Sequence, residues 1–224
     1  MNWWVTSAME GGVIVLGSWV FWVIFSICLH ELAHGYAAIW QGDDTPRATG
    51  HMTWNPLVHM GPTSLLFFAI LGIAWGAMPV NPYNFRSRYG DAIVAVAGPL
   101  TNALLMILCV IGSVVWVLTA GGVGEPYFKN VLIFFELGAM LNAVLMVFNL
   151  LPVPPLDGSK ILADFVPSYG RLWEGEKGAI VGLMVFALVF FYSGSFVFKA
   201  GQRVVDTVER VIVNAVAPAS GTRP

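Results

Sequence analysis

Residues 11–35 read GGVIVLGSWVFWVIFSICLHELAHG, a stretch with no charged side chain before Glu31. A helix that crosses a bilayer needs about 20 mostly apolar residues, so this stretch is long enough to span a membrane. Further uncharged runs occupy residues 48–85, 92–124, 137–156 and 178–198. The sequence therefore predicts a multi-pass membrane protein.

The composition agrees with this prediction. The chain has 224 residues, of which 57% are hydrophobic and 11% are charged, whereas a soluble domain is typically about 25% charged. Its 11 Lys and Arg against 13 Asp and Glu give a formal net charge of -2, so no basic field is available to hold nucleic acid. A soluble domain and a nucleic-acid-binding protein are both excluded, and the lipid bilayer is the expected environment.

Helix is the expected structure of each apolar run. Lipid offers no partner for an open backbone, and no run has the polar alternation of a barrel strand. We predict helices over residues 13–40, 91–119, 131–151 and 178–198, in an all-α polytopic membrane protein with four full transmembrane helices. Residues 41–61 contain several Asp, Pro and Gly residues, which predicts a loop.

Residues 62–78 are apolar but short, bracketed by Pro62 and Pro79 and interrupted by Gly72 and Gly76. We predict that this segment is re-entrant or only partly inserted. Such backbone is tolerated at membrane depth where it is buried in protein or lines a cavity.

The predicted domain organisation is a single transmembrane domain over residues 1–198, followed by a tail over 199–224. In the tail, apolar residues recur at helical spacing opposite charged ones, which predicts an interfacial amphipathic helix. The apolar positions are Val204, Val208, Val211 and Ala215, and the charged ones are Arg203, Asp206 and Arg210. Residues 218–224 are predicted to be disordered.

The sequence His30-Glu31-Leu32-Ala33-His34 continues the first apolar helix. Histidines one helical turn apart can bind one Zn²⁺ through their imidazoles, with the glutamate between them as a general base. An H-E-x-x-H also occurs by chance in many proteins. However, a charged residue inside a membrane costs roughly 2.5–3.5 kcal/mol on insertion scales and marks a functional site by default.

Catalytic zinc usually has three protein ligands, so another side chain must complete the set. The best candidate is Asp157, which ends the stretch NLLPVPPLDG over residues 149–158, after a Pro-rich break and before a glycine. Glu136 and Asp91 also lie near apolar runs. For all three acids, an ordinary place at a helix end or turn is the structural alternative.

The depth of these ligands gives a test of topology. His30 and His34 lie toward the C-terminal end of the first helix, and Asp157 follows the helix predicted over 131–151. The two helices must therefore run in the same direction, which requires that segment 62–78 does not cross the membrane fully.

This arrangement places residues 41–61, 79–90 and 157–177 on one side of the membrane. By the positive-inside rule that side is cytoplasmic, and the metal then lies near the cytoplasmic face. The bias is modest, because basic residues occur on both sides. The first side carries Arg47, Arg86, Arg88, Lys160, Arg171 and Lys177, and the other carries Lys129, Lys199, Arg203 and Arg210.

The H-E-x-x-H helix together with the later N-x-x-P-x-P-P-L-D-G stretch resembles the site-2 protease family of intramembrane zinc metalloproteases. The resemblance extends over about residues 28–162. It includes three further segments: Asn55-Pro56-Leu57-Val58-His59, Pro79-Val80-Asn81-Pro82-Tyr83-Asn84-Phe85-Arg86 and Ala97-Gly98-Pro99-Leu100-Thr101-Asn102.

The resemblance implies that His30, His34 and Asp157 bind one Zn²⁺ per chain and that Glu31 is the catalytic base. The family's G-x-x-x-N matches Gly98 and Asn102, which implies contact with the substrate strand. The implied activity is cleavage of transmembrane segments of single-pass proteins, in regulated proteolysis or in clearance of membrane remnants, and we expect the protein in the cell membrane of a prokaryote.

The chain departs from the family pattern at two places. Residues 60–62 read Met-Gly-Pro where some members have Asp-Pro, and residues 76–79 read Gly-Ala-Met-Pro where some have Lys-Pro. These departures leave the zinc set intact but remove support for a charge-based role near His59.

Four further polar residues are candidates for the site. His59 is a polar group near the metal, a donor to the transition state, a ligand, or an ordinary loop histidine. Asn102 and Asn149 contact either substrate or a neighbouring helix, and Asn142 is expected to pack between helices.

Two rival functions are a catalytically silent scaffold that keeps the fold and a haem or metal carrier. The intact Glu31 and ligand set disfavour the scaffold. The two axial ligands of a haem lie on opposite faces of its ring. Histidines at positions i and i+4 of one helix point the same way, so they cannot both bind one haem in this manner. A transporter would be expected to have more buried charge or paired broken helices.

Overall fold

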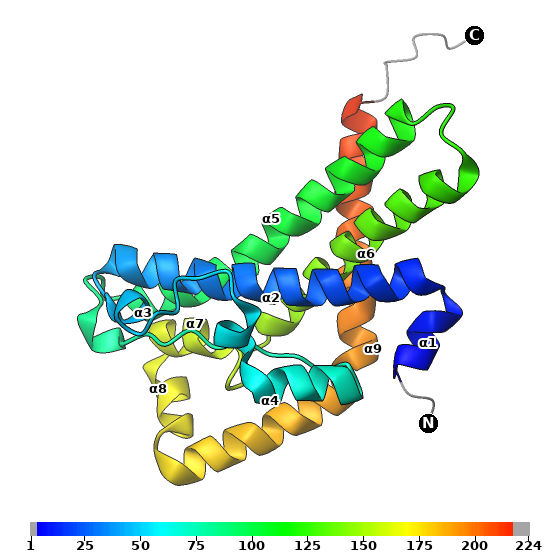
Figure 1. Cartoon of the computed structure of the whole chain (residues 1–224). Coiled ribbons are helices and arrows are strands. Elements are labelled where there is room, and N and C mark those ends of the chain that lie inside the picture. The colour runs from blue at the N-terminus through cyan, green and yellow to red at the C-terminus, as the bar shows by residue number, and fades with distance from the viewer. Residues whose placement is uncertain (1–3, 217–224) are drawn as a thin grey trace.

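The computed structural model describes residues 4–216 and consists of helices joined by short connections, with no strand among those residues (Figure 1). Four helices are long and apolar enough to cross a membrane. They are α2 (Val13–Gln41), α5 (Gly90–Thr119), α6 (Glu125–Asn149) and α9 (Gly175–Val216). The prediction of an all-α polytopic membrane protein is confirmed.

Shorter elements connect the four spans. They are α1 (Trp4–Glu10), α3 (Thr45–Ala48), α4 (Pro56–Leu71), η1 (Pro82–Asn84), α7 (Asp157–Phe165), α8 (Pro167–Gly170) and η2 (Arg171–Trp173). Helix α3 and the first turns of α4 lie within residues 41–61, so the prediction of a loop throughout that stretch is wrong. Asn55 explains where α4 begins, because its side chain accepts a hydrogen bond from the Leu57 N–H and Pro56 follows at the first helical position.

The bounds of α2 and α5 match the prediction to within a residue at each end. Helix α6 begins earlier than predicted, at Glu125, because Pro126 suits a first helical turn and Lys129 is tolerated near a helix end. Helix α9 is continuous through residue 198, where a transmembrane helix and a separate tail were predicted. Gly201 allows this continuation to lie close to Val144 of α6.

The tail helix packs on protein. Val204, Val205, Val208 and Ile212 lie against the hydrophobic core, whereas Val211 is 64% exposed. The packed face is therefore slightly off the predicted register, and the tail is the second half of a long helix, whose interfacial position stays a prediction. Residues 218–224, predicted to be disordered, lie outside the described residues.

The core forms where α2, α5 and α6 cross. The indole of Trp22 on α2 donates a hydrogen bond to the carbonyl of Phe134 on α6 (2.8 Å). Gly138 lets the α6 backbone approach, because a Cβ there would lie 2.7 Å from the Cys109 sulfur on α5 and would also collide with Trp22. Small residues at such contacts are typical of helix packing in membranes.

Helix α4 and the chain after it form a hairpin. The helix is kinked at Gly61, whose φ of 67° suits glycine, and ends at Gly72. The returning strand-like segment is bonded to the helix. Ser64 Oγ donates to the Trp75 carbonyl (2.7 Å) and accepts from the Trp75 N–H (2.9 Å), and the Ala77 N–H donates to the His59 carbonyl (2.9 Å).

The chain that returns from the hairpin is bonded to Asp43, just past the end of α2. Its buried carboxylate accepts hydrogen bonds from the Asn81 N–H (2.7 Å), Asn84 Nδ2 (2.9 Å) and both donors of Thr45. Burial alone would raise the pKa of Asp43, but these hydrogen bonds outweigh it and hold the pKa below its usual value. The chain therefore leaves α2 and enters α5 at the same end of the molecule, as the predicted partial insertion requires.

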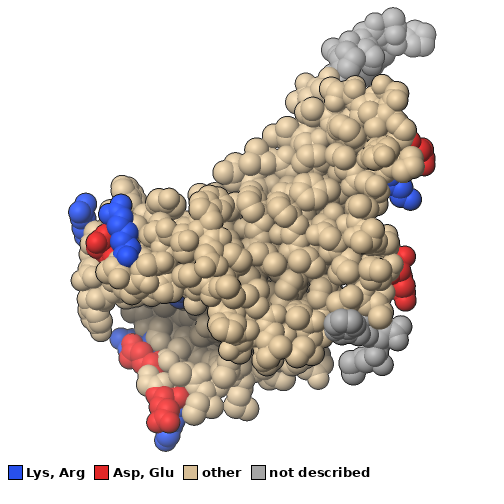
Figure 2. All heavy atoms as spheres, in the orientation of Figure 1, with Lys and Arg blue, Asp and Glu red and all other residues tan. Residues whose placement is uncertain are grey.

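Charged side chains gather at opposite ends of the face shown in Figure 2, and an uncharged band lies between them. Helix α2 runs across this band in the same orientation in Figure 1. This distribution fits a bilayer whose two surfaces lie at the two charged ends.

We expect Asp43→Ala to destabilise the fold by about 2 to 3 kcal/mol, because the substitution leaves several buried donors without an acceptor. The measurement is the temperature at which the buried thiols of Cys28 and Cys109 react with a fluorescent maleimide in detergent. The matched control is Asp44→Ala, because Asp44 is exposed and its ion pair with Arg47 contributes about 0 to 1 kcal/mol. Equal reaction temperatures for the two variants would contradict the role of Asp43.

The Asp43 contribution should also depend on pH. Since its folded pKa is lowered, its contribution is full at neutral pH and is lost as pH falls below about 4 through the folded pKa. The difference in unfolding temperature between wild type and Asp43→Asn is therefore expected to shrink under those acidic conditions, where it is followed by circular dichroism because thiols react too slowly with maleimide. A difference that grew with acid would contradict the pKa assignment.

Candidate metal centre

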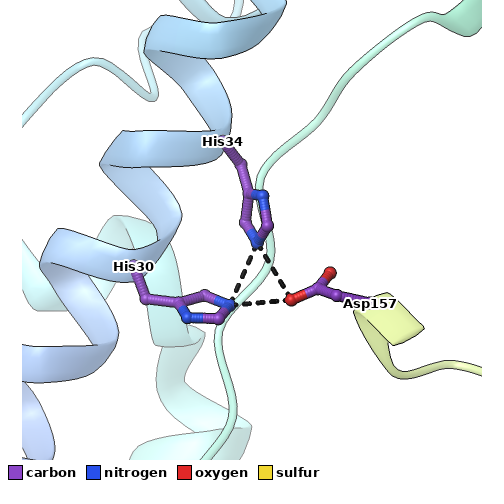
Figure 3. A group of neighbouring side chains, drawn as sticks. All are labelled: His30, His34 and Asp157. Carbon is purple, nitrogen blue, oxygen red and sulfur yellow. Dashed lines mark hydrogen bonds and ion pairs between the residues drawn. The ribbon is translucent and has the colours of Figure 1, made fainter. Parts of the chain in front are cut away.

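Three side chains from two distant segments converge on one point (Figure 3). His30 and His34 project from α2, and Asp157 is the first residue of α7. The Nε2 atoms of the two histidines lie 3.0 Å apart. Asp157 Oδ2 lies 3.1 Å from His30 Nε2 and 3.3 Å from His34 Nε2. All three residues are buried.

The position of Asp157 follows from the bend between α6 and α7. Residues 150–156 form turns that carry the chain away from α6, and α7 then begins at Asp157. Gly158 is required here, because a Cβ at this position would collide with the Leu150 carbonyl. The Pro-rich break and the glycine noted in the sequence are thus what aim the carboxylate at α2.

Hydrogen bonds fix the tautomer of both histidines. His30 Nδ1 lies 2.6 Å from Asn102 Oδ1, and His34 Nδ1 lies 2.7 Å from the Val94 carbonyl. Carbonyl oxygens only accept, so each Nδ1 carries the donated proton and each Nε2 presents a lone pair. Metal-binding histidines are commonly oriented by such bonds at the other ring nitrogen.

The result is a buried cluster of three acceptors. Burial alone would raise the pKa of Asp157, and positive charge beside the carboxylate, which protonated His30 and His34 supply when no metal is bound, holds the pKa below its usual range. Two imidazole lone pairs and a carboxylate oxygen at 3.0–3.3 Å repel one another unless a cation lies between them.

This geometry fits zinc. In a tetrahedral site with ligand bonds of about 2.0–2.2 Å, ligand atoms lie about 3.4 Å from one another. The observed spacings are close to this value, and the two-nitrogen, one-oxygen set is a common catalytic zinc set. The residues present can therefore hold a Zn²⁺ ion and leave its fourth position for water.

Asn102 belongs to a buried chain of amides. Its Nδ2 donates to Asn142 Oδ1 (3.0 Å), and Asn142 Nδ2 donates to the Gly138 carbonyl (2.9 Å). Both asparagines are fully buried. Asn102 therefore holds His30 in place, and Asn142 joins α6 to α5, in agreement with the packing role expected for it.

Gly98 lies directly against the histidines. A Cβ at this position would lie 2.5 Å from the Nε2 atoms of both His30 and His34. The spacing of Gly98 and Asn102 by four residues places both on the face of α5 that meets α2. In this structure Gly98 leaves room for both imidazoles, and Asn102 holds His30 through a hydrogen bond.

Glu31 lies beside the cluster, against the returning segment of the hairpin. A Cβ at Gly76 would lie 2.5 Å from Glu31 Oε1, so glycine there allows the carboxylate to fit. Glu31, both histidines and Asp157 line one cavity of about 1340 Å³. The carboxylate and the three converging acceptors are therefore open to the same space.

The walls of this cavity are mainly apolar and come from the hairpin, the end of α6 and the first half of α9, where Phe67, Phe148 and Phe186 lie. Asn149 also lines it, with Nδ2 bonded to the Leu145 carbonyl. Figure 2 shows a recess beneath α2, next to charged side chains. The charged residues that line the cavity are Asp91, Lys160, Asp164, Arg171 and Glu174, besides Glu31 and Asp157.

Other sequence candidates lie elsewhere. His59 is buried on α4, where its Nε2 donates to the Thr53 carbonyl (2.6 Å), and it is not part of the ligand group. Glu136 lies on α6 facing a different cavity, and Asp91 lines the mouth of the metal cavity. Sequence reasoning missed the Val94 carbonyl and the role of Gly76, because neither contact leaves a pattern in the sequence.

Comparison with known proteins shows clear relatives. A family model described as Peptidase family M50 matches residues 110–193. "Putative zinc metalloprotease YwhC" of Bacillus subtilis (strain 168) is 36% identical over 173 residues, which cover 75% of this chain and 77% of that protein. "Putative zinc metalloprotease Rip2" of Mycobacterium tuberculosis (strain ATCC 25618 / H37Rv) is 30% identical over 193 residues, 82% of this chain and 70% of that protein. No solved structure matches the chain.

Gly98→Ala is expected to weaken zinc binding by at least about tenfold, because its Cβ would displace both imidazoles. The control is Gly194→Ala on α9, where a Cβ meets open space. Zinc affinity is measured by competition with a chromophoric chelator in detergent. Unchanged affinity in folded Gly98→Ala would show that Gly98 does not shape the site.

Asn102→Ala should lower zinc affinity about 10- to 100-fold, which is the usual effect of removing a group that orients a ligand histidine. Asn102→Asp keeps an acceptor for His30 Nδ1 and is expected to recover part of the lost affinity. If the two variants bind zinc equally well, the hydrogen bond to His30 does not orient the ligand.

Proposed function

We propose that this chain, a zinc metalloprotease that belongs to peptidase family M50, hydrolyses peptide bonds in transmembrane segments of other membrane proteins. The observation that carries the proposal is the position of the site. Two imidazoles, a carboxylate and Glu31 face one cavity that is walled by apolar helices of a multi-pass protein. A site of this kind is suited to apolar polypeptide that is already in the bilayer.

We assign one Zn²⁺ per chain to His30, His34 and Asp157. When bound there, zinc supplies a water whose pKa is lowered toward about 7 and polarises the carbonyl to be cleaved. Glu31 takes the proton from the attacking water and passes it to the leaving amine. Asn102 and the Val94 carbonyl keep both histidines in the tautomer that leaves Nε2 free for the ion.

The proposed substrate is a single-pass membrane protein. Its helix must unwind locally, because the backbone amides of an intact helix are already hydrogen-bonded and shielded. The apolar walls of the cavity accept the side chains of such a segment, and polar residues at the mouth admit water. We propose that Asn149, whose Oδ1 is not used in its bond to Leu145, contacts the unwound backbone.

We further propose that the site faces the cytoplasmic side of a prokaryotic cell membrane. The connections at the metal end carry more basic residues than those at the opposite end. The two relatives described above come from bacteria. Cleavage near the cytoplasmic surface releases a cytoplasmic fragment, which is the form of regulated intramembrane proteolysis.

Glu31→Gln is expected to abolish cleavage while the fold and about one zinc per chain remain, because the amide cannot take a proton from water. The measurement is release of a labelled cytoplasmic domain from single-pass test proteins reconstituted with the enzyme in vesicles. Glu125→Gln, at the far end of α6, is the control and should cleave as wild type does. Equal cleavage by Glu31→Gln and wild type would overturn the mechanism.

A further inference from the structure

A second cavity lies at the other end of the helix bundle. It has a volume of about 1060 Å³ and lies between α2, the second half of α5, the first half of α6 and the second half of α9. Its walls are mainly aliphatic, and include Val110 and Val117 on α5, Ile133 on α6 and Val205 on α9. We call this cavity the α5–α6–α9 groove.

The groove is separate from the metal cavity, and the two share no lining residue. On α5 the metal cavity ends at Ala95 and the groove begins at Val110, which corresponds to about 22 Å of helix. The groove therefore lies toward the membrane surface opposite the metal. Proteolysis at the metal does not use it.

Two carboxylates lie in this apolar groove. Glu136 is exposed and close to the midpoint of α6, and Glu209 of α9 lines the same groove. Within residues 4–216, neither acid takes part in an ion pair. The neighbouring Arg210 is turned away and donates to the Asp206 carbonyl and to Thr207 Oγ1.

An acid in this position needs an explanation. Ionisable residues exposed within a transmembrane helix are costly and are usually paired or functional. Glu136 does not contribute to the core and does not reach the metal. A cation supplied from outside the chain would offset the cost of both carboxylates.

The depth of Glu136 identifies the kind of cation. It lies about 16 Å along α6 from Glu125 and about 20 Å from Asn149, so it is well inside both ends of a helix long enough to span a membrane. The amine of a lipid headgroup therefore lies too far toward the surface. A lysine or arginine in the apolar span of another helix reaches this depth, and such a residue itself needs an acidic partner.

We propose that the α5–α6–α9 groove is a docking site for a transmembrane helix of a partner protein that carries a lysine or arginine in its apolar span. Its aliphatic side chains pack against the valines of the groove, and its cation pairs with Glu136 and Glu209. The site would attach a regulator or a substrate-delivering protein without blocking the metal cavity. This inference does not depend on the proposed proteolysis.

The test uses the full chain with Glu31→Gln, which prevents cleavage of the probe, in phosphatidylcholine vesicles. An acceptor dye is attached at Gly121→Cys, since Gly121 lies in the α5–α6 turn with open space around it and both native cysteines are buried. The probes are two donor-labelled Leu/Ala transmembrane peptides that differ only in a central Lys or a central Gln. Energy transfer is titrated against the peptide-to-lipid ratio.

The Lys peptide is expected to half-saturate at a peptide fraction at least about tenfold lower than the Gln peptide. Adding Glu136→Gln should remove this preference, whereas adding Glu125→Gln, at the start of α6, should keep it. Glu136→Lys combined with Glu209→Gln should reverse the preference toward a peptide with a central Glu, and this gain shows that the variant is folded. Zinc content of each variant gives a second check of the fold.

Equal binding of the Lys and Gln peptides, or a preference that survives Glu136→Gln, would overturn the proposal. A second copy of this chain is the competing occupant. Energy transfer between donor- and acceptor-labelled chains without peptide, lost in Glu136→Gln, would assign the groove to self-association and would also overturn it.

Discussion

The structure depends on the repulsion among three acceptors held together in a buried place. His30 Nε2, His34 Nε2 and Asp157 Oδ2 lie within 3.3 Å of one another. Hydrogen bonds at both Nδ1 atoms prevent either ring from turning its proton toward the others. A cation among the three atoms offsets this repulsion, and the two nitrogens and one oxygen form a set that could hold a metal ion.

The supporting structure explains several features that would otherwise look unrelated. Gly98 gives the imidazoles room, Asn102 holds one of them, and Asn142 holds Asn102 while joining α5 to α6. The α4 hairpin brings Gly76 against Glu31, and the chain returning from it is bonded to Asp43. By reversing without crossing, the hairpin also makes α2 and α6 run the same way, so that Asp157 meets the histidines at one depth.

The chemical site could be predicted from the sequence because its signals are local. The spacing of His30 and His34 and the acid after a Pro-rich helix end are visible in a few residues each, and a common depth for the ligands then predicts the hairpin. Contacts between distant segments leave no such signal. The support of His34 by the Val94 carbonyl, the packing of the tail on α5 and α6, and the position of His59 against Thr53 are set by tertiary packing.

The most direct test of this account is a zinc K-edge absorption measurement on the detergent-purified chain, beside an Asp157→Ala variant. The account predicts about one zinc per wild-type chain, with two imidazole nitrogens and oxygen ligands at about 2.0–2.2 Å. In the variant, zinc content should fall sharply. A folded wild-type chain that binds no zinc even after zinc is resupplied, or an Asp157→Ala variant with unchanged coordination, would contradict the assignment of the three ligands.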